Sequence, residues 1–296
     1  IDPVGAPHMR SLPDWLIYLF VLILVVGAIY LFPAEWLPEP AEQPNSKAES
    51  DAKIAATVGK PLPPPSLFDD VIKIEAAQPQ NGTGTAFAIN QSGDWLTARH
   101  VVEGCDEIKL FAVAGIPSPV HSVVFDEDSD LAILKSEAID TPLSLNLAED
   151  LFVGSGGYHA GFPQGRPGEV QSRLHSQTLS FTFGQREGTE PVLIWIEQDR
   201  TNGLNGDLGG ISGGPVFNSR GEVMSVSLAY SGRLGRLYSS APKSIEAFLT
   251  KAGVAPDAVG HSEDISNATY TQAANRARAS KQIAKLVCTV KEEAPE

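Results

Sequence analysis

The chain has 296 residues, of which 42% are hydrophobic and 20% are charged, and it contains 27 glycines. This length and composition exclude a fully disordered chain and allow one or two domains with a sizeable core. The formal net charge of −14 argues against nucleic acid as a main partner, because phosphate binding requires clustered Lys and Arg.

The N-terminal part of the chain carries one long apolar segment. Residues 1–8 precede Met9 and are interpreted as a cloning scar, so residues 1–14 contribute only a short N-terminal segment. Residues 15–32 (WLIYLFVLILVVGAIYLF) contain no charge, and as a helix they would span about 27 Å, close to a bilayer's hydrocarbon thickness. We therefore expect a single transmembrane helix that contacts the lipid bilayer. The alternative is a cleaved signal peptide.

The flanking residues predict an orientation and a tether. Arg10 precedes the apolar segment, whereas the next basic residue after it is Lys47. Because basic residues stay cytoplasmic, we expect a cytoplasmic N-terminus and an extracytoplasmic body. Residues 33–66 are rich in Pro, Ala, Glu and Ser, a composition typical of a flexible, extended linker.

From residue 67 onward the chain consists of short apolar runs separated by turn signals such as Asn-Gly and Ser-Gly. Several runs alternate apolar and polar residues, which predicts β-strands in a barrel or sandwich. One set of strands ends near residue 147, and a second set runs from 152 to about 240. Residues 243–252 and 268–280 are then predicted helices, and residues 283–290 a strand, so that 254–296 form a C-terminal helix and strand extension.

The segment GGISGGPVF, residues 209–217, places one serine among four glycines. A serine hydroxyl attacks a carbonyl carbon at neutral pH only when a base removes its proton, and a carboxylate-oriented histidine suits that role. His100 follows a predicted strand in TARHVV, and Asp130 directly precedes another in DSDLAIL. Ser212, His100 and Asp130 are therefore candidates for a catalytic triad.

Gly210-x-Ser212-x-Gly214 also fits the nucleophile elbow of α/β-hydrolases, which requires Asp and then His after the serine. Only His261 follows Ser212, and the surrounding segments are β-rich, so this elbow is rejected. The alternative for each triad candidate is an ordinary turn residue. Surface or packing roles are expected for four other histidines, His121, His159, His175 and His261.

The order His, Asp, Ser in a β-rich chain is that of chymotrypsin-like enzymes. The motifs TARHVV, DSDLAIL and GISGGPVFN resemble those of the trypsin-like serine protease family over about residues 68–249. The similarity is greatest to bacterial members, including the high-temperature-requirement (Deg) proteases. The resemblance implies an all-β fold, a chymotrypsin-like double six-stranded β-barrel with C-terminal helices. The protease domain would span 67–253, with barrels at about 67–147 and 152–240.

The resemblance also implies roles for single residues. His100 corresponds to the general base and acid, Asp130 to the residue that orients it, and Ser212 to the nucleophile. The backbone amides of Gly210 and Ser212 correspond to the oxyanion hole. Ile211 departs from the pattern of secreted zymogens, which have an aspartate here that pairs with a newly cut N-terminus. Activation by such an ion pair is therefore not expected.

The substrate pocket implied by the resemblance includes Gly206 at its base and residues 227–229 on one wall: Ser227, Leu228 and Ala229. These residues carry no charge, which favours small or apolar side chains at the P1 position of a substrate. Asp207 is one residue away and would enter the pocket if the loop were shifted.

The only two cysteines, Cys105 and Cys288, lack the spacing of a metal site. In an oxidising compartment they would form a disulfide, whereas two free buried thiols are the alternative. No metal or other cofactor is expected.

Together these features predict a membrane-tethered serine endopeptidase in the bacterial periplasm, acting on polypeptide substrates through an acyl-enzyme. The alternatives are an esterase with the same triad, or a catalytically latent pseudoprotease that acts as a binding module. Both the endopeptidase and the pseudoprotease would be compatible with an unidentified partner protein in the membrane or periplasm. Deg proteases usually append a PDZ domain, and no segment after Gly253 is long enough for one.

Overall fold

The computed structural model describes residues 58–66, 71–76, 80–184, 187–258 and 262–291. The predicted N-terminal segment, the transmembrane helix at 15–32 and most of the linker lie outside these ranges. Within them, no helix has the length and apolar character that crossing a bilayer would require.

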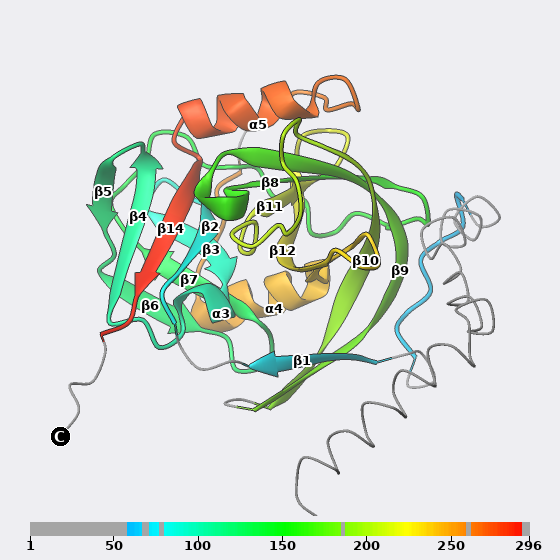
Figure 1. Cartoon of the computed structure of the whole chain (residues 1–296), viewed down its shortest axis with the longest axis horizontal. Helices are drawn as coiled ribbons and strands as arrows, with labels where there is room; N and C mark the ends of the chain where they lie inside the picture. Colours follow the sequence, from blue (N-terminus) through cyan, green and yellow to red (C-terminus); the bar gives the residue numbers. More distant parts are fainter. Residues whose placement is uncertain (1–57, 67–70, 77–79, 185–186, 259–261, 292–296) are drawn as a thin grey trace, which may run out of the picture. The chain divides into compact units, whose positions relative to one another are not determined.

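The first of two seven-stranded sheets lies on the left of Figure 1 and follows the order β5-β4-β14-β2-β3-β7-β6. Its strands are β2 (Gly82–Ala88), β3 (Asp94–Ala98), β4 (Glu107–Val113), β5 (Ile116–Pro119), β6 (Ser122–Phe125), β7 (Leu131–Lys135) and β14 (Ile283–Thr289). A single helical turn, α3 (Arg99–Val102), follows β3 directly.

The second sheet follows the order β1-β9-β10-β13-β12-β11-β8 and is closed into a barrel because β8 also pairs with β9. Its strands are β1 (Ile72–Ala76), β8 (Gly156–Gly161), β9 (Gly168–Gly184), β10 (Gly188–Arg200), β11 (Pro215–Phe217), β12 (Val223–Ser231) and β13 (Arg236–Ser240). A short 3-10 turn, η2 (Pro163–Gly165), joins β8 to β9.

The mostly β architecture with few helices is confirmed. Each sheet in the described part of the chain has seven strands, but in the second sheet six of them, β8 to β13, form the closed ring and β1 flanks it. Strand β1 belongs to the second sheet, where it lies parallel to β9, and β14 lies between β2 and β4 of the first. The predicted barrel limits, 67–147 and 152–240, therefore differ from the observed sheets in these two strands. Apolar alternation identifies a strand, but pairing partners far away in the chain depend on tertiary packing.

Two helices follow β13, as predicted. Helix α4 (Pro242–Ala252) begins with a proline and ends at Gly253 in a left-handed conformation, and it buries Ile245, Phe248 and Leu249. Helix α5 (Tyr270–Ala279) buries Tyr270, Ala274 and Ala277, one face of the helix. It lies beside β9 and β14, at the top of Figure 1.

The two sheets share one hydrophobic core. Its buried side chains come from the first sheet, from the second sheet and from both helices, for example Phe87, Leu96, Phe217, Val226 and Phe248. Such a shared core fixes one sheet against the other, because close-packed interiors tolerate little displacement.

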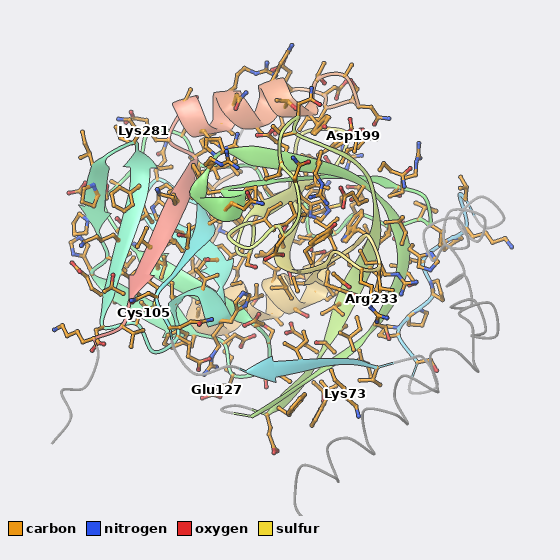
Figure 2. The ribbon with its side chains drawn as sticks, in the orientation of Figure 1. Lys73, Cys105, Glu127, Asp199, Arg233 and Lys281 are labelled. Carbon is orange, nitrogen blue, oxygen red and sulfur yellow. A yellow bond between two sulfur atoms is a disulfide. The ribbon has the colours of Figure 1, made fainter. Side chains whose placement is uncertain are left out.

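A disulfide joins Cys105, in the turn after α3 and labelled in Figure 2, to Cys288 of β14, with 5.4 Å between the two Cα atoms. The predicted pairing is confirmed. This bond attaches the C-terminal strand to the segment that carries His100.

Candidate active site

His100 and Asp130 meet because their strands are neighbours. His100 lies in α3, just past the end of β3, and Asp130 lies just before β7. In the ladder between these strands, Ala98 is paired with Leu131. The register therefore places both candidates at the same edge of the first sheet.

The Asp130 carboxylate holds His100 at two points. Its Oδ2 lies 2.6 Å from His100 Nδ1, and its Oδ1 accepts the His100 backbone N–H at 3.0 Å. The Asp130 side chain is 12% exposed and the His100 side chain 46%. A carboxylate at Nδ1 favours a proton on that nitrogen and leaves Nε2 as the base, so the half-exposed ring is oriented for proton transfer.

A second carboxylate lies behind this pair. Glu190, on β10, is 4% exposed, and its Oε1 accepts the backbone N–H of Asp130 at 2.9 Å. The contact connects the second sheet to the Asp130 turn. Nothing in the sequence singles out Glu190, since a lone carboxylate at the start of a strand is ordinarily solvated.

The loop that carries Ser212 packs tightly against the first sheet. Gly213 has φ +83°, and a Cβ there would come within 2.2 Å of both Thr85 O and Thr97 Oγ1. The amide of Thr85 donates to Ser212 O at 2.9 Å. The serine segment therefore contacts the end of β3, only a few residues before His100.

The Ser212 hydroxyl donates to the carbonyl oxygen of Leu228 at 2.9 Å. A hydroxyl carries one proton, so Ser212 cannot donate to His100 while this bond exists. A rotation about the Cα–Cβ bond is required to direct the proton toward Nε2.

The serine loop carries the two backbone amides, of Gly210 and Ser212, that the resemblance assigns to an oxyanion hole. Among the described residues, neither the Gly210 N–H nor the Ser212 N–H donates to a protein acceptor. The flanking carbonyls are engaged: Gly209 O accepts Gln164 N–H at 2.6 Å and Gly210 O accepts the Thr85 hydroxyl at 2.7 Å. Backbone amides without a protein acceptor are the kind of donor that can bind an oxyanion.

Ile211 anchors the same loop through burial. It is 1% exposed and packs in a cluster with Leu204, Leu208 and Trp195 inside the second sheet. Its amide donates to Leu208 O at 3.0 Å. Apolar packing therefore holds the position that secreted zymogens stabilise with an ion pair.

The predicted pocket residues are divided between the surface and the interior. Gly206 has φ +76° and borders an open cavity of about 570 Å³ together with Arg200, Asp207 and Tyr230. The side chains of Ser227 and Leu228 are buried, and Ala229 is half-buried.

Arg200 fixes one side of this cavity. Its guanidinium bonds Glu197 at 2.5 and 2.6 Å and the Tyr230 hydroxyl at 2.6 Å. The hydrogen bond to Glu197 raises the pKa of Arg200 above its ordinary value. The sequence does not identify this residue, because an arginine at a strand end is common.

His159 has a packing role, as the sequence predicts. It is fully buried between Ser227 Oγ, 3.0 Å from Nδ1, and Ser172 Oγ, 2.9 Å from Nε2. Burial lowers its pKa to about 3, so the ring is neutral. Because the Ser172 hydroxyl donates to Gly157 O, Nε2 carries the ring proton and Nδ1 accepts from Ser227. A neutral ring with no exposed surface cannot reach a substrate.

Comparison with known families agrees with this geometry. Residues 84–226 match the family model of the trypsin-like peptidase domain, a range that includes His100, Asp130 and Ser212. This segment, slightly less than half of the chain, is similar to a trypsin-like peptidase domain. Both C-terminal helices and β14 lie beyond the matched part of this domain.

The relatives of the peptidase domain include bacterial serine proteases. A probable periplasmic serine endoprotease DegP-like from Hahella chejuensis is 33% identical over 162 residues, which cover 54% of this chain and 32% of that protein. The putative serine protease HhoB of Synechocystis is 27% identical over 154 residues, covering 51% of this chain and 35% of the relative. The chain therefore spans about a third of the length of these relatives.

The fold is also found among solved structures. The Rv3671c protease from M. tuberculosis, in its active form, superposes with a TM-score of 0.50 at 19% identity, covering 69% of this chain and 99% of that one. At this identity the similarity shows the chymotrypsin-like fold alone.

Proposed function

We propose that the chain is a serine endopeptidase that hydrolyses polypeptides with His100, Asp130 and Ser212. The main support for the proposal is the pair of contacts that the Asp130 carboxylate makes with the His100 backbone N–H and with His100 Nδ1. Both residues lie within a segment that matches a peptidase family. The exposed His100 ring and the adjacent Ser212 loop support it.

The reaction follows from the positions of these groups. Ser212 rotates away from Leu228 O, gives its proton to His100 Nε2 and attacks the peptide carbonyl carbon. The amides of Gly210 and Ser212 stabilise the negative oxygen of the tetrahedral intermediate. As the C–N bond breaks, His100 returns the proton to the leaving amine. Water then attacks the acyl-enzyme with the same base, releasing the acid and restoring the serine.

A latent pseudoprotease is the competing function. Latency would require the oxyanion site to be blocked, whereas the bonds at Gly209 O and Gly210 O leave both amides unengaged. The test is labelling by a fluorophosphonate probe, with Ser212→Ala as the control. We expect labelling of the unmutated protein alone. No labelling, even with unfolded substrate added, would favour the binding module, and cleavage of esters without peptides would favour an esterase.

The location of the protein is part of the proposal. Relatives described as periplasmic and the apolar segment 15–32 support a membrane-tethered protease domain outside the cytoplasm. Protease treatment of spheroplasts tests it: digestion of the body without cell lysis is expected, and protection of the body would contradict the orientation. A partner in the membrane or periplasm would be found by crosslinking from the same cells.

A small or apolar P1 residue remains the proposed specificity, supported by Gly206 at the border of the open cavity. Profiling with a peptide library tests this preference. A preference for basic P1 residues, abolished by Asp207→Asn, would instead assign the pocket to Asp207.

A further inference from the structure

The C-terminal helix α5 contacts the turn that supports the Gly210 amide. Arg278, on α5, has a side chain only 9% exposed and pairs at 2.5 Å with Glu169 of β9, which is 3% exposed. This is a buried ion pair, and arginine suits such sites because its planar group makes several directed hydrogen bonds. Arg278 also lies over the Phe162 ring, 5.5 Å from its centroid.

Arg278 closes the base of the β8–β9 hairpin. Gly161 and Gly168 are the last register pair of these strands. One guanidinium nitrogen of Arg278 donates to both carbonyl oxygens, at 2.9 Å to Gly161 and 3.0 Å to Gly168. Residues 161 and 168, which flank the 162–167 loop, are therefore both hydrogen-bonded to the same side chain of α5.

This same loop orients both peptide groups around Gly210. The backbone N–H of Gln164 donates to Gly209 O at 2.6 Å. Because a trans peptide directs its carbonyl and N–H to opposite sides, this bond turns the Gly210 N–H away from the loop. On the next peptide, Phe162 N–H donates to Thr85 Oγ1 at 3.0 Å, and Thr85 Oγ1 donates to Gly210 O at 2.7 Å.

The loop conformation needs external support. Gln164 has φ +54°, in the left-handed region that non-glycine residues rarely adopt. Its side-chain amide donates to the carbonyls of Asn205 and Asp207, at 2.7 and 2.8 Å. A strained residue persists only where its surroundings hold it, and Arg278 is the group that fixes both ends of this loop.

We propose that Arg278 is a positioning residue that keeps the oxyanion site formed, acting through the 162–167 loop. The inference rests on the proposed function. It makes the extension beyond residue 253, which lies outside the matched family region, a functional part of the peptidase.

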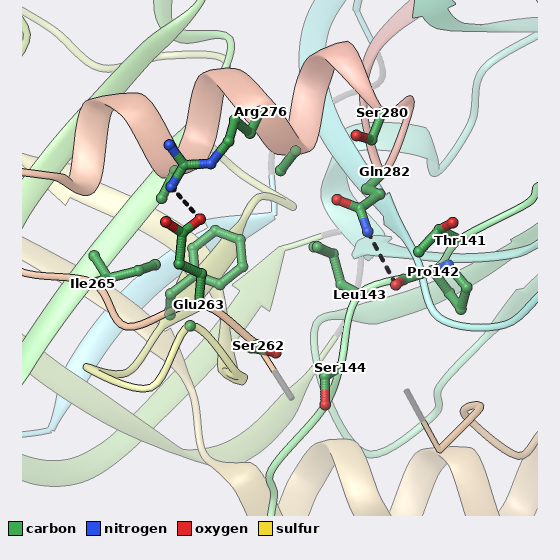
Figure 3. A pocket seen from close by; sticks show the side chains of 14 residues that line it. Thr141, Pro142, Leu143, Ser144, Ser262, Glu263, Ile265, Arg276, Ser280 and Gln282 are labelled. Atoms are coloured by element: carbon green, nitrogen blue, oxygen red, sulfur yellow. Dashed lines mark hydrogen bonds and ion pairs between the residues drawn. The ribbon is translucent and has the colours of Figure 1, made fainter. Parts of the chain in front are cut away.

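The chain offers a matched control on the same helix. Arg276 pairs with Glu263 at 2.6 Å, but both side chains are half exposed or more. Figure 3 shows this pair at a separate pocket of about 230 Å³, lined also by Leu143 and Gln282. Arg276→Met removes a similar charge and ion pair without touching the β8–β9 hairpin.

The kinetic test compares Arg278→Met, Arg278→Lys and Arg276→Met with the unmutated protein. Removing one oxyanion donor costs about 10²–10³ in kcat, so a misoriented donor should cost about 10–100-fold. We expect this loss in kcat for both Arg278 variants, with KM changed less than about 2-fold, and no change for Arg276→Met. Should Arg278→Met not fold, Arg278→Lys and the double variant Arg278→Met/Glu169→Gln, which leaves no unpaired buried charge, provide the test.

Hydrogen exchange separates this inference from the proposed function. In peptides covering residues 161–168 and 205–213, exchange should increase in the Arg278 variants and not in Arg276→Met. If the unmutated protein is inactive but exchange increases in this way, Arg278 does support the 162–167 loop, whereas the proposed function is wrong. If kcat and exchange match those of Arg276→Met, or if all peptides exchange faster to the same extent, Arg278 has no positioning role.

Discussion

Gly210 lies directly against the carbonyl oxygen of Phe162. A Cβ at Gly210 would come within 2.5 Å of that oxygen, and its φ of +102° also disfavours any other residue. The glycine thus permits the close approach of its backbone to the 162–167 loop.

Gly210→Ala is expected to lower kcat by about 10²–10³, the range for loss of one oxyanion donor, with little change in KM. Steady-state kinetics on a peptide substrate measures this. Gly115→Ala is the matched control, because Gly115 also has a positive φ, of +76°, but no atom lies within 4 Å of its added Cβ. Equal losses in both variants would assign the effect to backbone strain alone.

Ile211 provides a prediction about stability. Because it is buried in the second sheet, Ile211→Ala should lower the free energy of unfolding by about 2–4 kcal/mol. Ile211→Asp should cost more, since its carboxylate would be buried in an apolar cluster. Urea denaturation measures both, with the exposed Ile116→Ala as control. A stabilising effect of aspartate would indicate an ion pair like that of the zymogens.

Glu190 provides a prediction about the Asp130 turn. Glu190→Ala removes the acceptor of the buried Asp130 amide, which costs about 1–3 kcal/mol in an interior. We therefore expect kcat/KM to fall about 10-fold or more. Glu190→Gln keeps an acceptor oxygen and should retain most of the activity. Equal activity in the two variants would mean that the contact does not position Asp130.

The sequence predicts the part of the site that depends on local pattern. His100, Asp130 and Ser212 lie beside short apolar runs or glycines whose conformations are set by near neighbours. Arg278 is not predictable in this way, because an arginine in an Ala-rich helix ordinarily faces solvent. Its role depends on a contact between α5 and the β8–β9 hairpin, more than a hundred residues away. The position of β14 between β2 and β4 has the same origin, since only the folded sheet determines its partners.

His159 predicts an acid-dependent loss of stability. Burial lowers its pKa from 6.5 to about 3, so between these values the unfolded chain binds one proton more than the folded chain. The stability contributed by the neutral ring is complete above pH 6.5 and is lost as the pH falls towards 3, by about 1.4 kcal/mol per pH unit for this group. Urea denaturation between pH 4 and 7 should show a shallower pH slope for His159→Gln than for the unmutated protein. Parallel slopes would mean that the ring takes up its proton over the same pH range in the folded and unfolded chains, and this would contradict a neutral ring held by Ser172 and Ser227 in the interior.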